Sequence, residues 1–213
     1  GICGTDLHIV AGELGHPLPL VPGHEFAGEV VATGSGVTGL RVGDRVAVDP
    51  NLPCGSCRNC RRGRRNLCER YAALGVTTAG GAAEYAVAPA GSCVVLPAAA
   101  DLQLAALVEP LSCVVHAFDV LALRHGDHVL VYGAGTIGLM VSSLAQRGGA
   151  ASVSMVDIRH DRLAAARDLG ADEVATTAGE ITARERWDVV IDCSGAASAI
   201  TDGLARLDDG GTF

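Results

Sequence analysis

The chain has 213 residues, of which 24 are acidic and 16 basic, and a formal net charge of −8 at pH 7. This length allows one or two domains that each bury a core, and the negative charge argues against nucleic acid or an anionic membrane as the main partner. The sequence holds no uninterrupted apolar run of about 18 residues that could cross a membrane, and no leader precedes its first motif, so we expect a cytoplasmic protein. In that compartment, the eight cysteines are expected to be metal ligands or buried thiols rather than disulfides.

The first hundred residues predict a β-rich domain. Glycine and proline interrupt short alternating runs at 25–34, 44–50 and 82–89, a pattern typical of short strands joined by turns. The ends of the sequence predict that it is part of a longer chain, because it does not begin with Met and stops in "DDGGTF", where a strand is starting.

From residue 128 onward the pattern changes to alternating strands and helices. The predicted strands are 128–132, 152–157, 173–176 and 187–193, and the predicted helices are 136–147, 160–169 and 196–207. This alternation predicts an α/β fold with a parallel sheet wound with helices. We therefore predict two domains, at residues 1–118 and 119–213, with the boundary before the first strand of the parallel sheet.

Four cysteines lie close together in "CGSCRNCRRGRRNLC". They are Cys54, Cys57, Cys60 and Cys68. Four thiolates at this spacing can close a tetrahedral shell around zinc, and such a closed shell has a structural role. Two alternatives stay open: unligated thiols beside a solvated arginine run, and a zinc ribbon whose arginines bind phosphate. The negative balance of the whole chain disfavours the ribbon.

The stretch "VLVYGAGTIGLM" carries a GxGxxG pattern directly after an apolar strand. In a dinucleotide-binding turn the first glycine permits the tight turn, the second lets a pyrophosphate approach, and the third lets helix and strand pack closely. Asp157 follows the last glycine by 19 residues, where a carboxylate can bind a ribose and repel a 2′-phosphate, which favours NAD over NADP. The predicted cofactor-binding residues are Gly133, Gly135, Thr136, Ile137, Gly138, Asp157 and Arg162. Arg159 and Arg162 leave NADP open, and the alternative is that the glycines serve only a strand-to-helix turn.

The stretch "LAALVEPLSCVVHAF" carries the carboxylate of Glu109 among apolar residues. Burying an unpaired carboxylate is costly, so Glu109 needs a cation or a hydrogen-bond donor nearby. One candidate is the amino end of a helix that opens at Pro110. Upstream, "CGTDLH" and "VPGHE" supply Cys3 and His24, which are good zinc ligands by type.

Taken together, these motifs resemble those of the zinc-dependent medium-chain dehydrogenases. The matching stretches are "CGTDLH", "GHEFAGEV", "GDRVAV", the four-cysteine loop, "EPLS" and "GAGTIG", and the resemblance covers essentially the whole chain. The "EPLS" stretch is similar to the polyol, threonine and aminocyclitol dehydrogenase branch. The resemblance implies a GroES-like β-rich catalytic domain followed by a Rossmann domain, both truncated here, with one catalytic zinc, one structural zinc and NAD as cofactors.

The resemblance also implies roles for single residues. Cys3, His24 and Glu109 would hold the catalytic zinc, and Glu25 would sit behind the metal or exchange with water. Asp6 would orient His24. The catalytic residues would be Cys3, Thr5, His8 and His24, with Thr5 and His8 as a proton relay. Without the resemblance, Thr5 is interpreted as a turn residue and His8 as an exposed histidine.

The function implied is transfer of a hydride from a secondary alcohol to NAD. The substrate would be a small molecule, namely a polyol, a sugar-like compound or an aminocyclitol, and the enzyme would be a homo-oligomer. Two alternatives stay open. One is a simple alcohol dehydrogenase or an L-threonine 3-dehydrogenase, and the other is a zinc- and NAD-binding protein without turnover.

Overall fold

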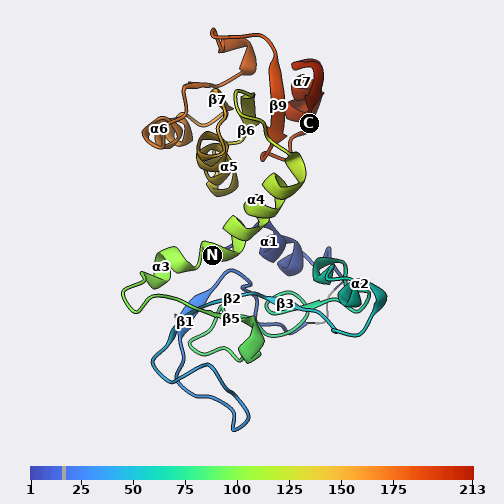
Figure 1. Cartoon of the computed structure of the whole chain (residues 1–213), viewed down its shortest axis with the longest axis vertical. Helices are drawn as coiled ribbons and strands as arrows, with labels where there is room; N and C mark the ends of the chain where they lie inside the picture. The colour runs from blue at the N-terminus through green and yellow to red at the C-terminus, as the bar shows by residue number, and fades with distance from the viewer. Residues whose placement is uncertain (16–17) are drawn as a thin grey trace. The chain divides into compact units, whose positions relative to one another are not determined.

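The computed structural model describes residues 1–15 and 18–213 and divides into two compact units, Gly1–Pro110 and Leu111–Phe213 (Figure 1). The division falls inside helix α4 (Val108–Leu121), which has 14 residues. The predicted domain boundary after residue 118 lies in this same helix and stays a prediction. Within the described part of the chain, no helix has the length and apolar character needed to span a bilayer.

The first unit consists of short strands, short helices and turns. Its elements are α1 (Gly4–Val10), β1 (Ala27–Glu29), β2 (Arg45–Val48), β3 (Asn51–Leu52), α2 (Arg58–Arg61), the 3₁₀ helix η1 (Arg65–Leu67), β4 (Ala72–Ala73), the 3₁₀ helix η2 (Ala90–Ser92), β5 (Cys93–Val95) and α3 (Leu102–Ala105). Strands β1, β2 and β5 form an antiparallel sheet, and β3 pairs with β4. Val46, Val48 and Leu74 form its small buried core, so this unit depends on more than apolar burial for its stability.

Two of the three strand predictions in this unit are confirmed, because β1 lies within 25–34 and β2 within 44–50. The third is wrong, since residues 82–89 form bends and irregular chain. The alternating side chains of Tyr85 and Val87 are 68% and 90% exposed. An alternating pattern becomes a strand only where another strand pairs with it, and none of the described strands pairs with this stretch.

The second unit is a doubly wound parallel sheet, as predicted. Its elements are β6 (His128–Tyr132), α5 (Thr136–Arg147), β7 (Ser152–Val156), α6 (His160–Asp168), β8 (Glu173–Ala175), the 3₁₀ helix η3 (Ala178–Glu180), β9 (Trp187–Asp192), α7 (Ala197–Ala205) and β10 (Leu207–Thr212). The strand order is β10-β9-β6-β7-β8, and all pairs are parallel. Every strand and helix predicted here ends within two residues of the prediction.

The central strand β6 is buried on both faces of this sheet. Val129 and Val131 pack into the core cluster that α5 and α6 cover, whereas Leu130 and Tyr132 pack into the cluster on the opposite face, next to α7. Figure 1 shows α5 and α6 on one side of the strands and α7 on the other. A strand covered by helices on both faces has to be apolar at successive positions, which explains the run "VLVY".

The turn between β6 and α5 depends on two close backbone approaches. Gly133 has φ +94°, a conformation that favours glycine, and a Cβ there would lie 2.9 Å from the carbonyl carbon of Cys193. A Cβ on Gly138 would lie 1.8 Å from the carbonyl oxygen of Gly133. By contrast, a Cβ on Gly135 would meet only Nη1 of Arg162, at 3.9 Å. The first and third glycines therefore serve packing, and the second keeps a space open.

This difference predicts that two alanine substitutions in the same turn change the free energy of unfolding by different amounts. Gly138→Ala should lower the free energy of unfolding by about 1–3 kcal/mol or more, because the new methyl group overlaps backbone that cannot move away easily. Gly135→Ala should change it by less than about 1 kcal/mol, the usual range for a change at a helix N-cap. Urea denaturation without added ligands measures both. Equal stability of the two variants would contradict the packing role of Gly138.

Candidate functional site

Three side chains with metal-ligand chemistry converge in the first unit. One sulfur of Cys3, one ring nitrogen of His24 and one carboxylate oxygen of Glu25 all lie within 4.8 Å of one another. Zinc bonds of about 2.0–2.3 Å in a tetrahedral shell place ligand atoms roughly 3–4 Å apart. The spacing and the mixture of sulfur, nitrogen and oxygen therefore fit zinc, and three protein ligands leave the fourth position of the shell for a small molecule.

The carboxylate of Asp6 ties two of these ligands together. Asp6 is 8% exposed, and it accepts a hydrogen bond from the backbone N–H of Cys3 at 2.8 Å. Its other oxygen accepts from the backbone N–H of Gly23 at 3.3 Å and lies 3.5 Å from Nδ1 of His24. Asp6 and His24 are therefore neighbours, and the orienting role of Asp6 stays a prediction. Among the described residues Nδ1 of His24 has no hydrogen-bond partner, so its contact with Asp6 is electrostatic.

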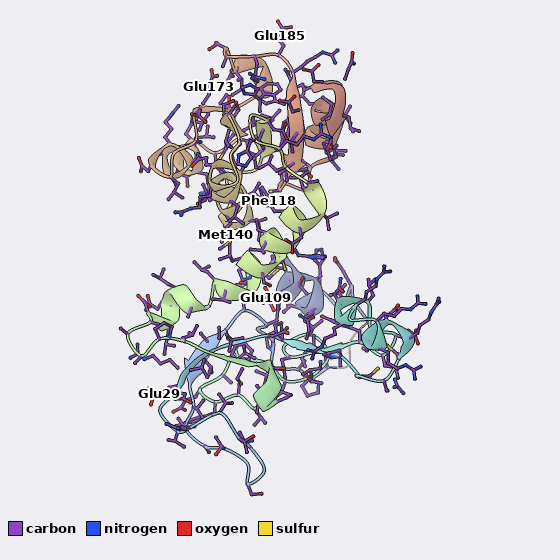
Figure 2. All side chains as sticks on the ribbon, in the orientation of Figure 1. Glu29, Glu109, Phe118, Met140, Glu173 and Glu185 are labelled. Carbon is purple, nitrogen blue, oxygen red and sulfur yellow. The ribbon has the colours of Figure 1, made fainter. Side chains whose placement is uncertain are left out.

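Glu109 lies in the first turn of α4, as Figure 2 shows. Its side chain is partly buried, and burial raises the pKa of its carboxyl group, with opposing electrostatic contributions from His24, which lowers the pKa, and from Glu25, which raises it. The three-member ligand group contains Glu25 rather than Glu109, so the arrangement differs from the predicted one in this member. The predicted opening of the helix at Pro110 is wrong, because α4 begins at Val108 and Glu109 lies inside it rather than before its first residue. The metal-ligand role of Glu109 stays a prediction.

The two predicted relay residues lie on α1, next to the metal ligands. Oγ1 of Thr5 is 3.7 Å from Sγ of Cys3, which donates to it. His8 is one helical turn further along, and its Nδ1 contacts Oε2 of Glu13, with both side chains 60% exposed. Thr5 therefore adjoins the ligand group, and His8 reaches solvent.

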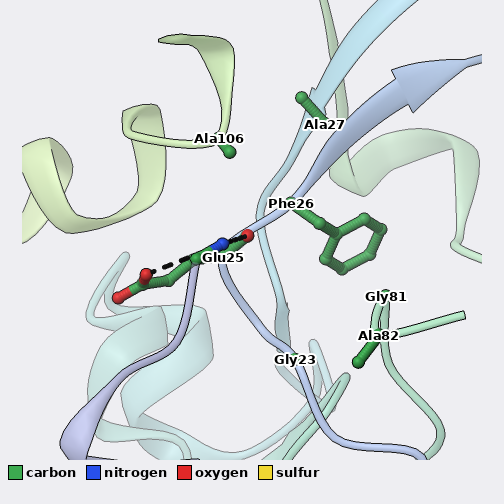
Figure 3. Close-up of a pocket in the computed structure, with 8 residues that line it drawn as sticks. Gly23, Glu25, Phe26, Ala27, Gly81, Ala82 and Ala106 are labelled. Atoms are coloured by element: carbon green, nitrogen blue, oxygen red, sulfur yellow. Dashed lines mark hydrogen bonds and ion pairs between the residues drawn. The ribbon is translucent and has the colours of Figure 1, made fainter. Parts of the chain in front are cut away.

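A small cavity of about 180 Å³ adjoins Glu25, and Figure 3 shows its lining. The lining residues are Gly1, Gly23, Glu25, Phe26, Ala27, Gly81, Ala82 and Ala106. Backbone hydrogen bonds of 2.8–2.9 Å join residues 80–82 to residues 21–23. These hydrogen bonds hold the loop before His24 against residues 80–82. The two segments are close enough that a Cβ on Gly23 would lie 2.8 Å from the backbone nitrogen of Ala82.

The four cysteines of the arginine-rich loop form a second group. The sulfur atoms of Cys54, Cys57, Cys60 and Cys68 all lie within 4.8 Å of one another, and all eight cysteines of the chain are free thiols. This set fits a tetrahedral four-sulfur zinc site with no open position. Backbone N–H groups already point at the sulfurs, as at Cys57, which accepts from Cys60 at 3.4 Å.

The thiols of this loop differ in acidity. A hydrogen bond from Arg70, helped by backbone N–H groups, lowers the pKa of Cys54 to about 5. Burial, together with the neighbouring sulfur of Cys57, raises the pKa of Cys60 to about 12. Four thiolates this close repel one another, and a divalent cation is what allows all four to be deprotonated together.

A larger cavity, of about 450 Å³, lies in the second unit at the carboxyl ends of the parallel strands. Its lining residues are Tyr132, Gly133, Gly135, Val156, Asp157, Ile158, Arg162, Thr176, Thr177, Ala178, Cys193, Ser194, Ala196, Ser198, Ala199 and Asp202. In doubly wound sheets, nucleotides bind at this end, where the strand order reverses. Here the reversal lies at β6, between β7 and β9.

The predicted cofactor residues take different positions around this cavity. Gly133, Gly135, Asp157 and Arg162 line it, whereas Gly138 packs against the carbonyl of Gly133. Thr136 and Ile137 begin helix α5 and are not among the lining residues. The open space at Gly135 leaves room for a phosphate group close to the backbone at the amino end of a helix.

Asp157 is held at the end of β7 by backbone hydrogen bonds. It is 7% exposed and accepts from the N–H groups of Ala134 at 2.8 Å and Arg159 at 2.9 Å. Nη1 of Arg162 lies 3.6 Å from Oδ2 of Asp157. The carboxylate therefore remains oriented at the cavity wall, with a cation beside it.

Several lining residues were not predicted from the sequence. Thr176 follows β8, Cys193 and Ser194 follow β9, and Asp202 lies on α7. The signal for the first three was available, because residues that follow the carboxyl ends of parallel strands meet at one edge of the sheet. Asp202 had no such signal, since it reaches the wall through a hydrogen bond of 2.7 Å that Tyr132 donates to it.

Comparison with protein families matches both units. Residues 1–98 match the alcohol dehydrogenase GroES-like domain, and residues 136–213 match the zinc-binding dehydrogenase family. The chain is 41% identical to D-altritol 5-dehydrogenase from Agrobacterium fabrum and 41% identical to L-threonine 3-dehydrogenase from Streptomyces coelicolor. These alignments cover 100% and 99% of the chain and 65% of each relative, so the chain spans about two thirds of the length of the curated relatives it matches.

The chain is also similar to solved structures of dehydrogenases. A zinc-binding dehydrogenase from Sinorhizobium meliloti, bound to NADP, superimposes with a TM-score of 0.93 at 35% identity, over 99% of this chain and 65% of that one. An alcohol dehydrogenase from Escherichia coli, in complex with NADH, gives a TM-score of 0.88 at 36% identity, over 99% of this chain and 64% of that one. The fold is thus a GroES-like domain followed by a Rossmann-type domain, and the chain belongs to the zinc-dependent medium-chain dehydrogenase family, in its polyol and threonine dehydrogenase branch.

Proposed function

We propose that the protein is a zinc-dependent oxidoreductase that transfers a hydride from a secondary alcohol to NAD. The convergence of Cys3, His24 and Glu25 carries this proposal. Three donors of sulfur, nitrogen and oxygen type around one point, with the fourth direction left to a substrate, are typical of catalytic rather than structural zinc. The names of the relatives, which are polyol and threonine dehydrogenases, support the same reaction class.

Zinc and NAD(H) are the cofactors. Bound zinc supplies a Lewis acid that lowers the pKa of an alcohol hydroxyl. Cys3, His24 and one carboxylate would hold it, and the charge balance favours a single carboxylate, because one thiolate and one carboxylate already cancel the charge of a divalent cation. Glu25 lies within the ligand group, and Glu109 would take its place if the two exchange.

The remaining residues of this site would position groups and move a proton. Asp6 would orient the ring of His24 through the contact at Nδ1. We assign Thr5 the role of a relay hydroxyl, because it adjoins Cys3: Oγ1 would accept the substrate's hydroxyl proton while its own proton passes to His8. His8 would then pass the proton to solvent, with Glu13 beside its ring.

The nucleotide would occupy the cavity of the second unit. The space at Gly135 would accept the pyrophosphate, and Asp157 would accept hydrogen bonds from the adenosine ribose. A carboxylate at that place repels a 2′-phosphate, so NAD is the expected cofactor rather than NADP. Bound NAD would supply the acceptor for the hydride of the carbinol carbon, and the hydroxyl proton would leave separately through Thr5 and His8.

The substrate class we propose is a small polyol, sugar-like or aminocyclitol alcohol. L-Threonine is the second candidate, because the chain is as similar to an L-threonine 3-dehydrogenase as to a D-altritol 5-dehydrogenase. Initial rates of NADH formation with D-altritol, sorbitol, inositol, L-threonine and ethanol separate these candidates. Binding of zinc and NAD without turnover of any of them would favour a non-catalytic protein.

We further infer a cytoplasmic, homo-oligomeric enzyme. Eight free cysteines fit a reducing compartment, and the oligomer is inferred from the family resemblance. Light scattering of the purified protein measures its mass in solution.

The two metal sites predict separable effects of ligand substitutions. Cys3→Ser and His24→Ala should each abolish turnover and reduce the zinc content from two ions per chain to one, because each removes a ligand of an open three-ligand site. Their melting temperatures should stay close to that of the unchanged protein. Elemental analysis and calorimetry measure these properties, and full activity in either variant would refute the catalytic zinc site.

The four-cysteine loop predicts a loss of stability instead. Cys57→Ser should lose the structural zinc and several kcal/mol of stability, since metal binding to such a loop contributes about 10 kcal/mol or more to folding. Cys93→Ser is the matched control, because that thiol lies outside the group and donates only to the carbonyl of Pro89 at 3.6 Å. Chelator titration followed by circular dichroism tests the difference. Equal resistance of the two variants to the chelator would count against a structural zinc.

The cofactor site predicts a change in nucleotide preference. Asp157→Ala should weaken NAD+ binding on the order of tenfold to a hundredfold, because it removes charge-assisted hydrogen bonds to the ribose. It should also reduce the preference for NAD+ over NADP+, because the repulsive charge is gone. Isothermal titration calorimetry with both nucleotides measures this ratio, and an unchanged ratio would exclude the ribose role of Asp157.

A further inference from the structure

We infer that Asp161 determines the cofactor preference of this protein by holding the guanidinium of Arg159 away from the nucleotide cavity. This inference rests on the proposed function, because it concerns the nucleotide that the second unit binds. It makes Asp161 a positioning residue that acts through Arg159 and has no contact of its own with the cofactor.

The geometry of the pair carries the inference. Asp161 accepts two hydrogen bonds from Arg159, one from Nε at 3.1 Å and one from Nη2 at 2.6 Å. The side chains of Arg159 and Asp161 are 57% and 66% exposed, and this two-point pairing directs the guanidinium group toward Asp161. The hydrogen bonds from Arg159 also hold the pKa of Asp161 below its ordinary value, so the carboxylate stays charged near neutral pH.

The direction of the Arg159 guanidinium matters because this residue lies next to residues that line the nucleotide cavity. It follows the ribose-binding position, Asp157, by two residues, and its backbone N–H donates to that carboxylate. Ile158 and Arg162 on either side of it line the cavity, whereas Arg159 does not. A free guanidinium at this place would be well suited to a 2′-phosphate, because arginine binds phosphate with two parallel hydrogen bonds.

The charges around the ribose position are thus paired. Arg162 lies beside Asp157, with Nη1 3.6 Å from Oδ2, and Arg159 lies beside Asp161. Each of the two arginines is paired with one carboxylate, so neither guanidinium is available to bind the additional phosphate of NADP. Removing the acid of the second pair would release one cation without altering the carboxylate that binds the ribose.

The test compares nucleotide binding by the purified, zinc-loaded protein and three variants. Asp161→Ala should strengthen NADP+ binding about tenfold, the effect of one charge-assisted hydrogen bond gained, and should change NAD+ binding less than about twofold. Asp168→Ala is the matched control, because it removes the same charge from an exposed position on the same helix. In the double variant Arg159→Ala/Asp161→Ala the gain should disappear, because the released guanidinium is absent.

Isothermal titration calorimetry with NAD+ and NADP+ gives both dissociation constants, and thermal denaturation verifies that each variant is folded. The inference is overturned if Asp161→Ala gains no more NADP+ affinity than Asp168→Ala, or if the gain persists in the double variant. Failure of the unchanged protein to bind NAD+ would overturn the proposed function and this inference together. Normal NAD+ binding with an unresponsive NADP+ affinity would overturn the inference alone.

Discussion

The carboxylate of Asp6 is the interaction on which the metal site depends. It accepts hydrogen bonds from the backbone N–H groups of Cys3 and of Gly23, which lies 17 residues after Asp6, and it approaches the ring of His24. Neither segment has much apolar surface to bury, so packing alone would not bring sulfur and imidazole to one point. A buried charge that accepts several N–H groups is stabilised only when all of them are in place. The segments that carry Cys3 and His24 are therefore linked through one carboxylate.

At the nucleotide cavity, another carboxylate also joins two backbone segments. Asp157 accepts from the backbone of Ala134, in the glycine turn after β6, and from Arg159, in the turn after β7. It thus joins two neighbouring strand ends and stays oriented at the cavity wall. In both units an acid to which the sequence analysis gave a role at the site also holds two backbone segments together. Replacing such a residue changes the shape of the site as well as its charge, which is why charge variants at Asp161, outside these contacts, are more informative about cofactor choice.

The second unit could be predicted from the sequence almost completely, and the first only in part. In the second unit each of the strands β6 to β9 is followed by a helix or a 3₁₀ helix, so the apolar period predicts the elements, and the glycine spacing locates the turn. In the first unit, strands are two to four residues long, which is too short for a period to be reliable. The stretch around Tyr85 alternates without a strand partner among the described strands. Helix α1 has no apolar face that would predict it, because Ile9 is buried whereas Leu7 and Val10 are exposed. Which glutamate joins Cys3 and His24 depends on loop packing between Gly23 and Ala82, and no local pattern encodes it.

The two-sided burial of β6 has a consequence for how the sheet is aligned. The strand is apolar from Val129 to Tyr132, so a shift of its register by one residue would exchange one apolar face for the other. The hydrophobic effect alone would therefore disfavour this shift only weakly. The resistance comes from the strand's first residue, His128, whose N–H donates to Asp188 at 2.8 Å and whose ring contacts Ser152 at 2.7 Å. These polar contacts at the amino end of β6 fix the register of its pairing with the neighbouring strands. The floor of the nucleotide cavity is consequently positioned by contacts at the opposite end of the strand.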